Sequence, residues 1–87
     1  MTTTTLDSFA PLVRFAAEHP QIVPDDYMFM GAEPWEVIYR YKHINTRRYL
    51  NLDCELPGQA YRYVAAAPPA RRYQPVPAAE AIEWVLS

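Results

Sequence analysis

Alternation of apolar and polar residues with a period of two is the feature of this sequence that most restricts its fold. It runs through residues 35–42 and again through residues 47–54. A period of two places successive side chains on opposite faces of an extended strand, whereas a helix repeats every 3.6 residues. The four residues between the two stretches suffice for a hairpin turn. The sequence therefore predicts two neighbouring antiparallel strands.

The pairing of these strands follows from their apolar residues. We expect Tyr39 to face Leu50 and Val37 to face Leu52, because residues directly opposite each other share a face of the sheet. This register gathers the apolar side chains on one side: Trp35, Val37, Tyr39, Leu50, Leu52 and Cys54. A register shifted by one residue would move half of them into water.

A third strand is predicted over residues 59–66, after a tight turn at Pro57-Gly58. In that pairing Cys54 faces Tyr61, so Tyr61 and Tyr63 join the apolar side. The opposite face is then left to solvent. It carries Glu36, Ile38, Arg40, Lys42, Arg47, Tyr49, Asn51, Asp53, Arg62 and Val64.

Helices are predicted at both ends of the chain. Residues 7–18 repeat apolar side chains at helical spacing, with Asp7 or Ser8 as the N-cap, and His19-Pro20 ends this helix. Residues 78–86 carry a second apolar stripe. The prolines of residues 67–77 favour an extended connection. Tyr27–Met30 is either a brief edge strand or a plug over the core.

The predicted fold class is therefore α+β, with a three- or four-stranded antiparallel meander between the two helices. We expect both helices on the one apolar face of the sheet, because the other face is polar. The 87 residues, 1–87, form a single domain, in which residues 1–5 are a flexible N-terminus.

Charge is segregated along the chain, although the net charge is only −2. Residues 35–73 hold seven of the eight basic residues and six of the seven tyrosines. The candidate binding residues lie on the polar face and at the tip of the first hairpin: Arg40, Lys42, Arg47, Arg48, Tyr49 and Arg62. Basic side chains beside an exposed aromatic suit an acidic protein surface, or a phosphate backbone with a stacked base.

These residues predict a small, non-enzymatic binding or adaptor protein. A protein partner is favoured over nucleic acid because the net charge is negative. Nucleic-acid binding through the same face is the first alternative, and self-association as a homodimer is the second. A fully structural explanation also stays open, because long polar side chains on strands protect a sheet against aggregation.

The residue patterns that disulfides, metal sites and catalysis require are missing from this sequence. Cys54 is the single cysteine, which excludes an intrachain disulfide, and its phase predicts a buried, inert thiol. His19 and His43 have no partner at metal-ligand spacing. We therefore expect no catalytic residue, no metal and no cofactor. The sequence has no apolar run of about 20 residues, the length that would predict a membrane-spanning helix. The lone cysteine favours a cytoplasmic location.

Overall fold

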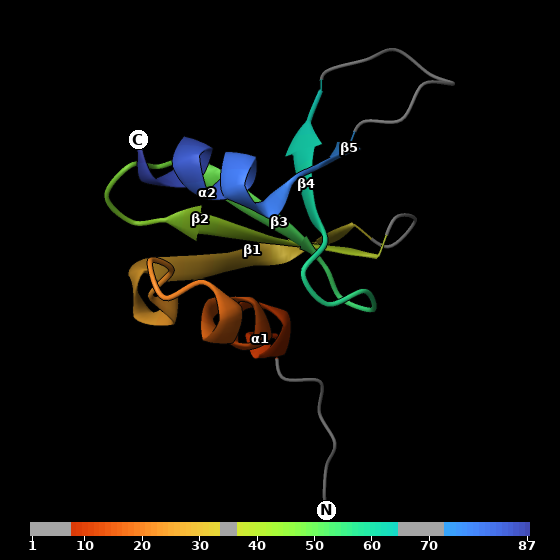
Figure 1. Ribbon diagram of the computed structural model, residues 1–87, viewed down its shortest axis with the longest axis horizontal. Helices are drawn as coiled ribbons and strands as arrows, with labels where there is room; N and C mark the ends of the chain where they lie inside the picture. Colours follow the sequence, from red (N-terminus) through yellow and green to blue (C-terminus); the bar gives the residue numbers. More distant parts are fainter. Residues whose placement is uncertain (1–7, 34–36, 65–72) are drawn as a thin grey trace, which may run out of the picture.

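The computed structural model describes residues 8–33, 37–64 and 73–87. Two helices flank an open antiparallel sheet of five strands in the order β1-β2-β3-β4-β5 (Figure 1). Along the chain the elements are α1 (Ala10–Glu18), the 3₁₀ turn η1 (Pro24–Asp26), β1 (Tyr27–Glu33), β2 (Ile38–His43), β3 (Tyr49–Asp53), β4 (Ala60–Tyr63), β5 (Tyr73–Val76) and α2 (Ala78–Leu86). The α+β class is confirmed, and the sheet has five strands instead of the three or four predicted.

The two additional strands lie at the edges of the sheet. Tyr27–Glu33 pairs with β2, so the edge-strand alternative for Tyr27–Met30 is the correct one. Tyr73–Val76 is extended as predicted, but it pairs with β4 instead of serving only as a connection. An edge strand tolerates Pro75 because one side of its backbone has no neighbouring strand among the described residues. The predicted flexible start and residues 65–72 lie outside the described residues.

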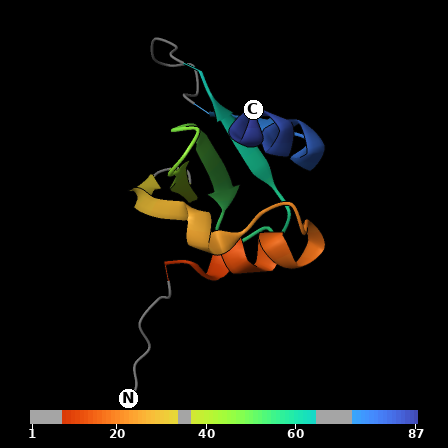
Figure 2. The ribbon, with the colours of Figure 1, turned by 90° about the vertical axis from the view of Figure 1, so that its left-hand side faces the viewer.

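Both helices pack their apolar sides into one core. Leu12 and Phe15 of α1 and Ile82 and Val85 of α2 belong to a single cluster of buried residues. The sheet contributes a row from one face: Tyr41, Leu50, Leu52 and Ala60. In Figure 2 both helices lie to one side of β1, β2 and β3, with α1 below the core and α2 above it. Burial of such an aliphatic side chain is worth about 1.5–3 kcal/mol.

The helix ends agree with the prediction except at the first cap. Helix α1 starts at Ala10 with Phe9 as its N-cap, and no side chain caps it, so the predicted cap at Ser8 is wrong. Pro11 stands in the first turn, where its missing N–H costs little. His19 ends the helix directly before Pro20, as predicted.

The first hairpin is shifted by two residues from the predicted register. Tyr39 pairs with Leu52 and Tyr41 pairs with Leu50. Because side chains alternate with a period of two, this shift keeps Tyr39, Leu50 and Leu52 on the predicted face. The shift originates at the turn, where the His43 amide N–H donates to the carbonyl oxygen of Arg48 (2.9 Å). Val37, with a φ of +55°, lies outside β2.

The second hairpin is shifted by three residues, which reverses the predicted faces of β4. Leu52 pairs with Ala60, and Asn51 pairs with Tyr61. The predicted Pro57-Gly58 tight turn is wrong, because residues 54–59 form a longer loop folded around the Asp53 carboxylate. Its Oδ1 accepts hydrogen bonds from the amides of Glu55 (2.7 Å) and Leu56 (2.8 Å).

Ala60 consequently enters the core, whereas Tyr61 and Tyr63 leave it. Three residues predicted to face solvent are also buried: Ile38 is 0 % exposed, Asn51 4 % and Asp53 8 %. Tyr61 accounts for part of this change, since its hydroxyl donates to Oδ2 of Asp53 (2.7 Å). The polar face is therefore a partly covered surface instead of an open one.

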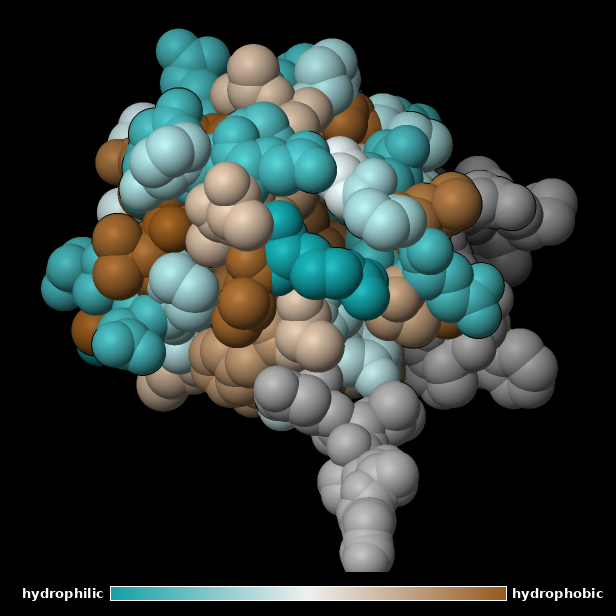
Figure 3. Space-filling model, turned by 60° about the horizontal axis from the view of Figure 1, so that its bottom comes forward, coloured by the Kyte–Doolittle hydropathy of each residue, from teal (hydrophilic) through white to brown (hydrophobic). Residues whose placement is uncertain are grey.

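Exposed apolar side chains elsewhere are interrupted by polar ones. Figure 3 views the α1 side, where brown apolar areas alternate with teal polar residues. Val13 on α1 and Val23 after it are about half exposed. Scattered apolar residues of this kind are ordinary on protein surfaces.

Candidate functional site

Arg40 on β2 is held in place by an irregularity in the neighbouring strand. The β1–β2 register shifts between Phe29 and Ala32, and Gly31 within this bulge has a φ of +110°. The bulge turns the Met30 carbonyl oxygen toward Arg40, whose Nη2 donates to it (2.8 Å). A side chain at position 31 would approach this guanidinium, since an added Cβ lies 3.4 Å from Arg40 Nη2. The bulge thus fixes the arginine.

Tyr49 at the start of β3 lies between two cations. The Arg40 Cζ and the Lys42 Nζ are each 6.0 Å from the centre of its ring, at the outer limit of a cation–π contact. Tyr49 pairs with Lys42, and Arg40 pairs with Asn51. The structure therefore brings two of the predicted binding residues, Arg40 and Lys42, to the aromatic ring of a third, Tyr49.

Arg48 packs against the second helix. Its Cζ lies 3.9 Å from the ring centre of Trp84 on α2. The hairpin tip is tied to the same helix by Thr46, whose hydroxyl donates to the Val85 carbonyl oxygen (2.7 Å). A guanidinium lying on a ring keeps its N–H donors in its own plane, where a carboxylate or phosphate can accept them.

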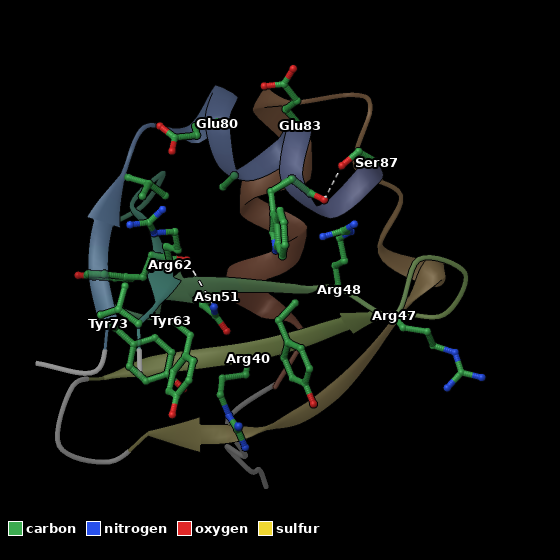
Figure 4. A pocket seen from close by; sticks show the side chains of 16 residues that line it. Arg40, Arg47, Arg48, Asn51, Arg62, Tyr63, Tyr73, Glu80, Glu83 and Ser87 are labelled. Carbon is green, nitrogen blue, oxygen red and sulfur yellow. Dashed lines mark hydrogen bonds between the residues drawn. The ribbon is translucent and has the colours of Figure 1, made fainter. Parts of the chain in front are cut away.

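These side chains line a pocket of about 1090 Å³ between the polar face of the sheet and α2 (Figure 4). We call it the arginine–tyrosine pocket, and its lining includes five of the six predicted binding residues: Arg40, Arg47, Arg48, Tyr49 and Arg62. Lys42 lies beside Tyr49. Figure 4 shows Arg47 at the rim, with its guanidinium directed away from the pocket. Glu80 and Glu83 of α2 are also among the pocket's lining residues.

Several pocket residues were not predicted as site residues. Tyr61 and Tyr63 were assigned to the core and Asn51 to solvent, and Trp84 belongs to the helix predicted over residues 78–86. Tyr63 is 55 % exposed, and it packs edge to face against Tyr73 of β5, with ring centres 5.3 Å apart. The alternation in residues 59–64 was visible in the sequence, but its phase depended on the loop at Asp53.

The pocket also holds two buried polar atoms that are not hydrogen-bonded. Arg40 Nε and Asn51 Oδ1 have no hydrogen-bond partner among the described residues. The Asn51 Nδ2 makes a long hydrogen bond to the Tyr61 carbonyl oxygen (3.4 Å). Buried polar groups usually find partners, so two unpaired atoms on neighbouring strands are unusual.

His43 and Cys54 serve the structure of the chain around the pocket. Nδ1 of His43 accepts hydrogen bonds from the amides of Asn45 (3.1 Å) and Thr46 (3.2 Å), which shapes the hairpin tip. Cys54 is half-buried instead of fully inward. Burial and the adjacent Glu55 and Asp53 carboxylates raise the pKa of the Cys54 thiol.

Within residues 8–33, 37–64 and 73–87, no three side chains that could ligate a metal ion are grouped together.

Comparison with known protein families, with characterised proteins and with solved structures gives no match to this chain. None of the helices in the part of the chain that the structure describes has the length and apolar character needed to cross a membrane.

Proposed function

We propose that the protein is a non-enzymatic binding protein that holds an acidic segment of a partner protein in the arginine–tyrosine pocket. One observation carries this proposal: Arg40 on β2, Arg48 at the tip of the first hairpin and Arg62 on β4 line the same pocket. Three guanidinium groups with aromatic neighbours favour a ligand that brings negative charge and some apolar surface.

Preorganisation of the arginines supports the proposal. The Met30 carbonyl oxygen holds Arg40, and the Trp84 ring supports Arg48. A side chain that is already ordered loses less conformational entropy when it binds. The N–H groups that these contacts leave available can then donate to a carboxylate of the partner.

Acidic residues in the pocket lining favour a peptide over a nucleic acid. Glu80 and Glu83 of α2 line the same pocket as the arginines. A nucleic-acid backbone carries a charge on every nucleotide, so part of it would approach these carboxylates. An acidic peptide can instead place uncharged residues there, and the net charge of −2 also disfavours a polyanion.

Selection from a display library of random 12-residue peptides tests the proposal. We expect enrichment of Asp and Glu on the immobilised protein. The best peptide should lose at least tenfold in affinity with Arg48→Glu, because a reversed charge then opposes the carboxylate. Arg14→Glu on α1 is the matched control: it changes the net charge equally, outside the pocket, and should leave the affinity within about twofold.

Two results would contradict this function. One is enrichment of neutral peptides, or equal losses for the two variants, which would leave bulk charge as the only determinant. The other is tighter binding of a 15-nucleotide oligodeoxythymidine than of the best peptide, with an affinity that falls steeply as salt rises. Such salt dependence is characteristic of phosphate neutralisation and would favour the nucleic-acid alternative.

A further inference from the structure

Arg40 and Asn51 offer an unpaired donor and an unpaired acceptor on two residues that are paired across neighbouring strands. The two residues are direct partners across β2 and β3, so their Cβ atoms are about 5 Å apart on one face. Arg40 Nε and Asn51 Oδ1 are both buried and have no hydrogen-bond partner within the described residues. Asn51 is only 4 % exposed, and both residues line the arginine–tyrosine pocket.

We propose that this pair is a subsite for a primary carboxamide, the side chain of an Asn or Gln within the bound acidic segment. The inference rests on the proposed function, which it extends from negative charge to a specific neutral group. The carbonyl oxygen of the carboxamide accepts from Arg40 Nε–H. One of its N–H groups donates to Asn51 Oδ1, so each unpaired atom gains its missing partner.

Other groups of a peptide fit this pair less well. A carboxylate has no N–H to donate and would place a negative charge against Asn51 Oδ1. A trans backbone amide directs its C=O and N–H in opposite directions, so it cannot serve two neighbouring atoms. A primary amide carries an N–H on the same side as its oxygen, which is the arrangement that the pair requires.

Side chains of the pocket control access to the subsite. Both unpaired atoms are closed to solvent in the unliganded protein, so a ligand must displace a neighbour to reach them. Tyr63, 55 % exposed, and the half-buried Tyr49 line the same pocket. Rotation of an exposed aromatic side chain costs little compared with a change in the sheet backbone.

Two fluorescein-labelled heptapeptides of equal charge test the subsite by fluorescence anisotropy. One is Asp-Glu-Asp-Gln-Asp-Glu-Asp, and the other has Leu in place of the central Gln. We expect the Gln peptide to bind about tenfold more tightly, the effect of two additional hydrogen bonds. In Asn51→Leu and in Arg40→Lys, which keeps the charge but removes the Nε–H, the two peptides should bind alike.

The wild-type comparison separates the two proposals even if a variant folds poorly. Equal affinities of the Gln and Leu peptides, both above that of a neutral Gly-Ser heptapeptide, would overturn the subsite and leave the proposed function standing. If neither acidic peptide exceeded the neutral one, both proposals would fail. Displacement of the Gln peptide by oligodeoxyadenosine but not by oligodeoxythymidine would also overturn the carboxamide, because adenine presents the same donor and acceptor on one edge.

Discussion

Asp53 shows how one residue can decide the structure of a hairpin. Its carboxylate accepts three hydrogen bonds, from the amides of Glu55 and Leu56 and from the Tyr61 hydroxyl. Burial alone would raise the pKa of Asp53, but these hydrogen bonds outweigh it and hold the pKa below its usual range. An aspartate, whose short side chain lets its carboxylate accept hydrogen bonds from the amides two and three residues ahead, commonly forms a turn.

The Asp53 carboxylate should therefore contribute to stability above its unfolded-state pKa of about 3.9. Because its folded pKa is the lower one, this contribution is lost as the pH falls from about 4 through the folded pKa. Asp53→Asn should reduce the free energy of unfolding at pH 7 by about 1–3 kcal/mol, since the hydrogen bonds lose their charged acceptor. Urea titrations at several pH values measure both effects.

Glu55→Gln is the control for this prediction. It removes one negative charge, as Asp53→Asn does, but from Glu55, which is exposed in the same loop. The free energy of unfolding of this variant should differ from that of the wild type by less than about 0.5 kcal/mol. An Asp53→Asn variant with the same stability and the same acid dependence as the wild type would show that the carboxylate does not organise the loop.

Individual side chains were predicted with mixed success from the sequence. The placement of Tyr49 among basic residues followed from strand alternation, and the structure has it between Arg40 and Lys42. Asn51 was expected in water because it is polar and out of phase with Leu52. Its burial depends on β4, whose register is set by side-chain hydrogen bonds that alternation does not encode.

Among the elements, strands were easier to predict than their pairing. The period-two pattern found β2, β3 and β4, and the helix periodicity found both helices. An error of two residues in the first hairpin left its faces correct, whereas an error of three residues in the second reversed them. β5 was missed because prolines in the segment disfavour a paired strand, although an edge position accommodates them.

The bulge in β1 gives a prediction at the scale of one element. Gly31→Ala should lower the free energy of unfolding by about 1–3 kcal/mol, because its φ of +110° is unfavourable for residues with a Cβ. The new methyl group would also come into contact with Arg40 Nη2, 3.4 Å away, and a change in the bulge would move the Met30 carbonyl oxygen that holds this side chain. The affinity for the acidic peptides should consequently fall, as measured by anisotropy on the folded variant.

Gly58→Ala is the matched control for the bulge. Gly58 also has a positive φ, +83°, but an added Cβ would meet nothing within 4 Å. Its variant should lose stability through backbone strain alone and keep the wild-type affinity. If both glycine variants weakened peptide binding equally, the contact between the bulge and Arg40 would not be what positions the arginine.

At the scale of the whole molecule, the pocket arises from segments far apart in the sequence. Arg48 at the first hairpin meets Trp84 in the last helix, and Tyr63 meets Tyr73 across the β4–β5 pair. Strand periodicity predicted the common face of Arg40, Lys42 and Tyr49 correctly. Arg62 was expected on that face too, but the shift of the second hairpin places it on the side of Ala60. The sequence could not predict the acidic residues that α2 brings to the pocket, because the position of a helix over a sheet depends on core packing.

The shared core makes a final prediction for the whole chain. Leu12 on α1 and Val85 on α2 are both 0 % exposed and belong to one cluster. Leu12→Ala should lower the free energy of unfolding by about 2–5 kcal/mol, because it leaves a cavity.

Since both helices close the same core, the loss of the Leu12 side chain should destabilise α2 as well as α1. Tryptophan fluorescence, measured in a Trp35→Phe background that leaves Trp84 in α2 as the single tryptophan, should then change in one transition together with far-ultraviolet circular dichroism. Val13→Ala, at a position 51 % exposed on the same helix, should leave that transition within about 0.5 kcal/mol of the wild type. Separate fluorescence and dichroism transitions in Leu12→Ala would mean that the helices stabilise independent units, and the pocket between α2 and the sheet would then persist without α1.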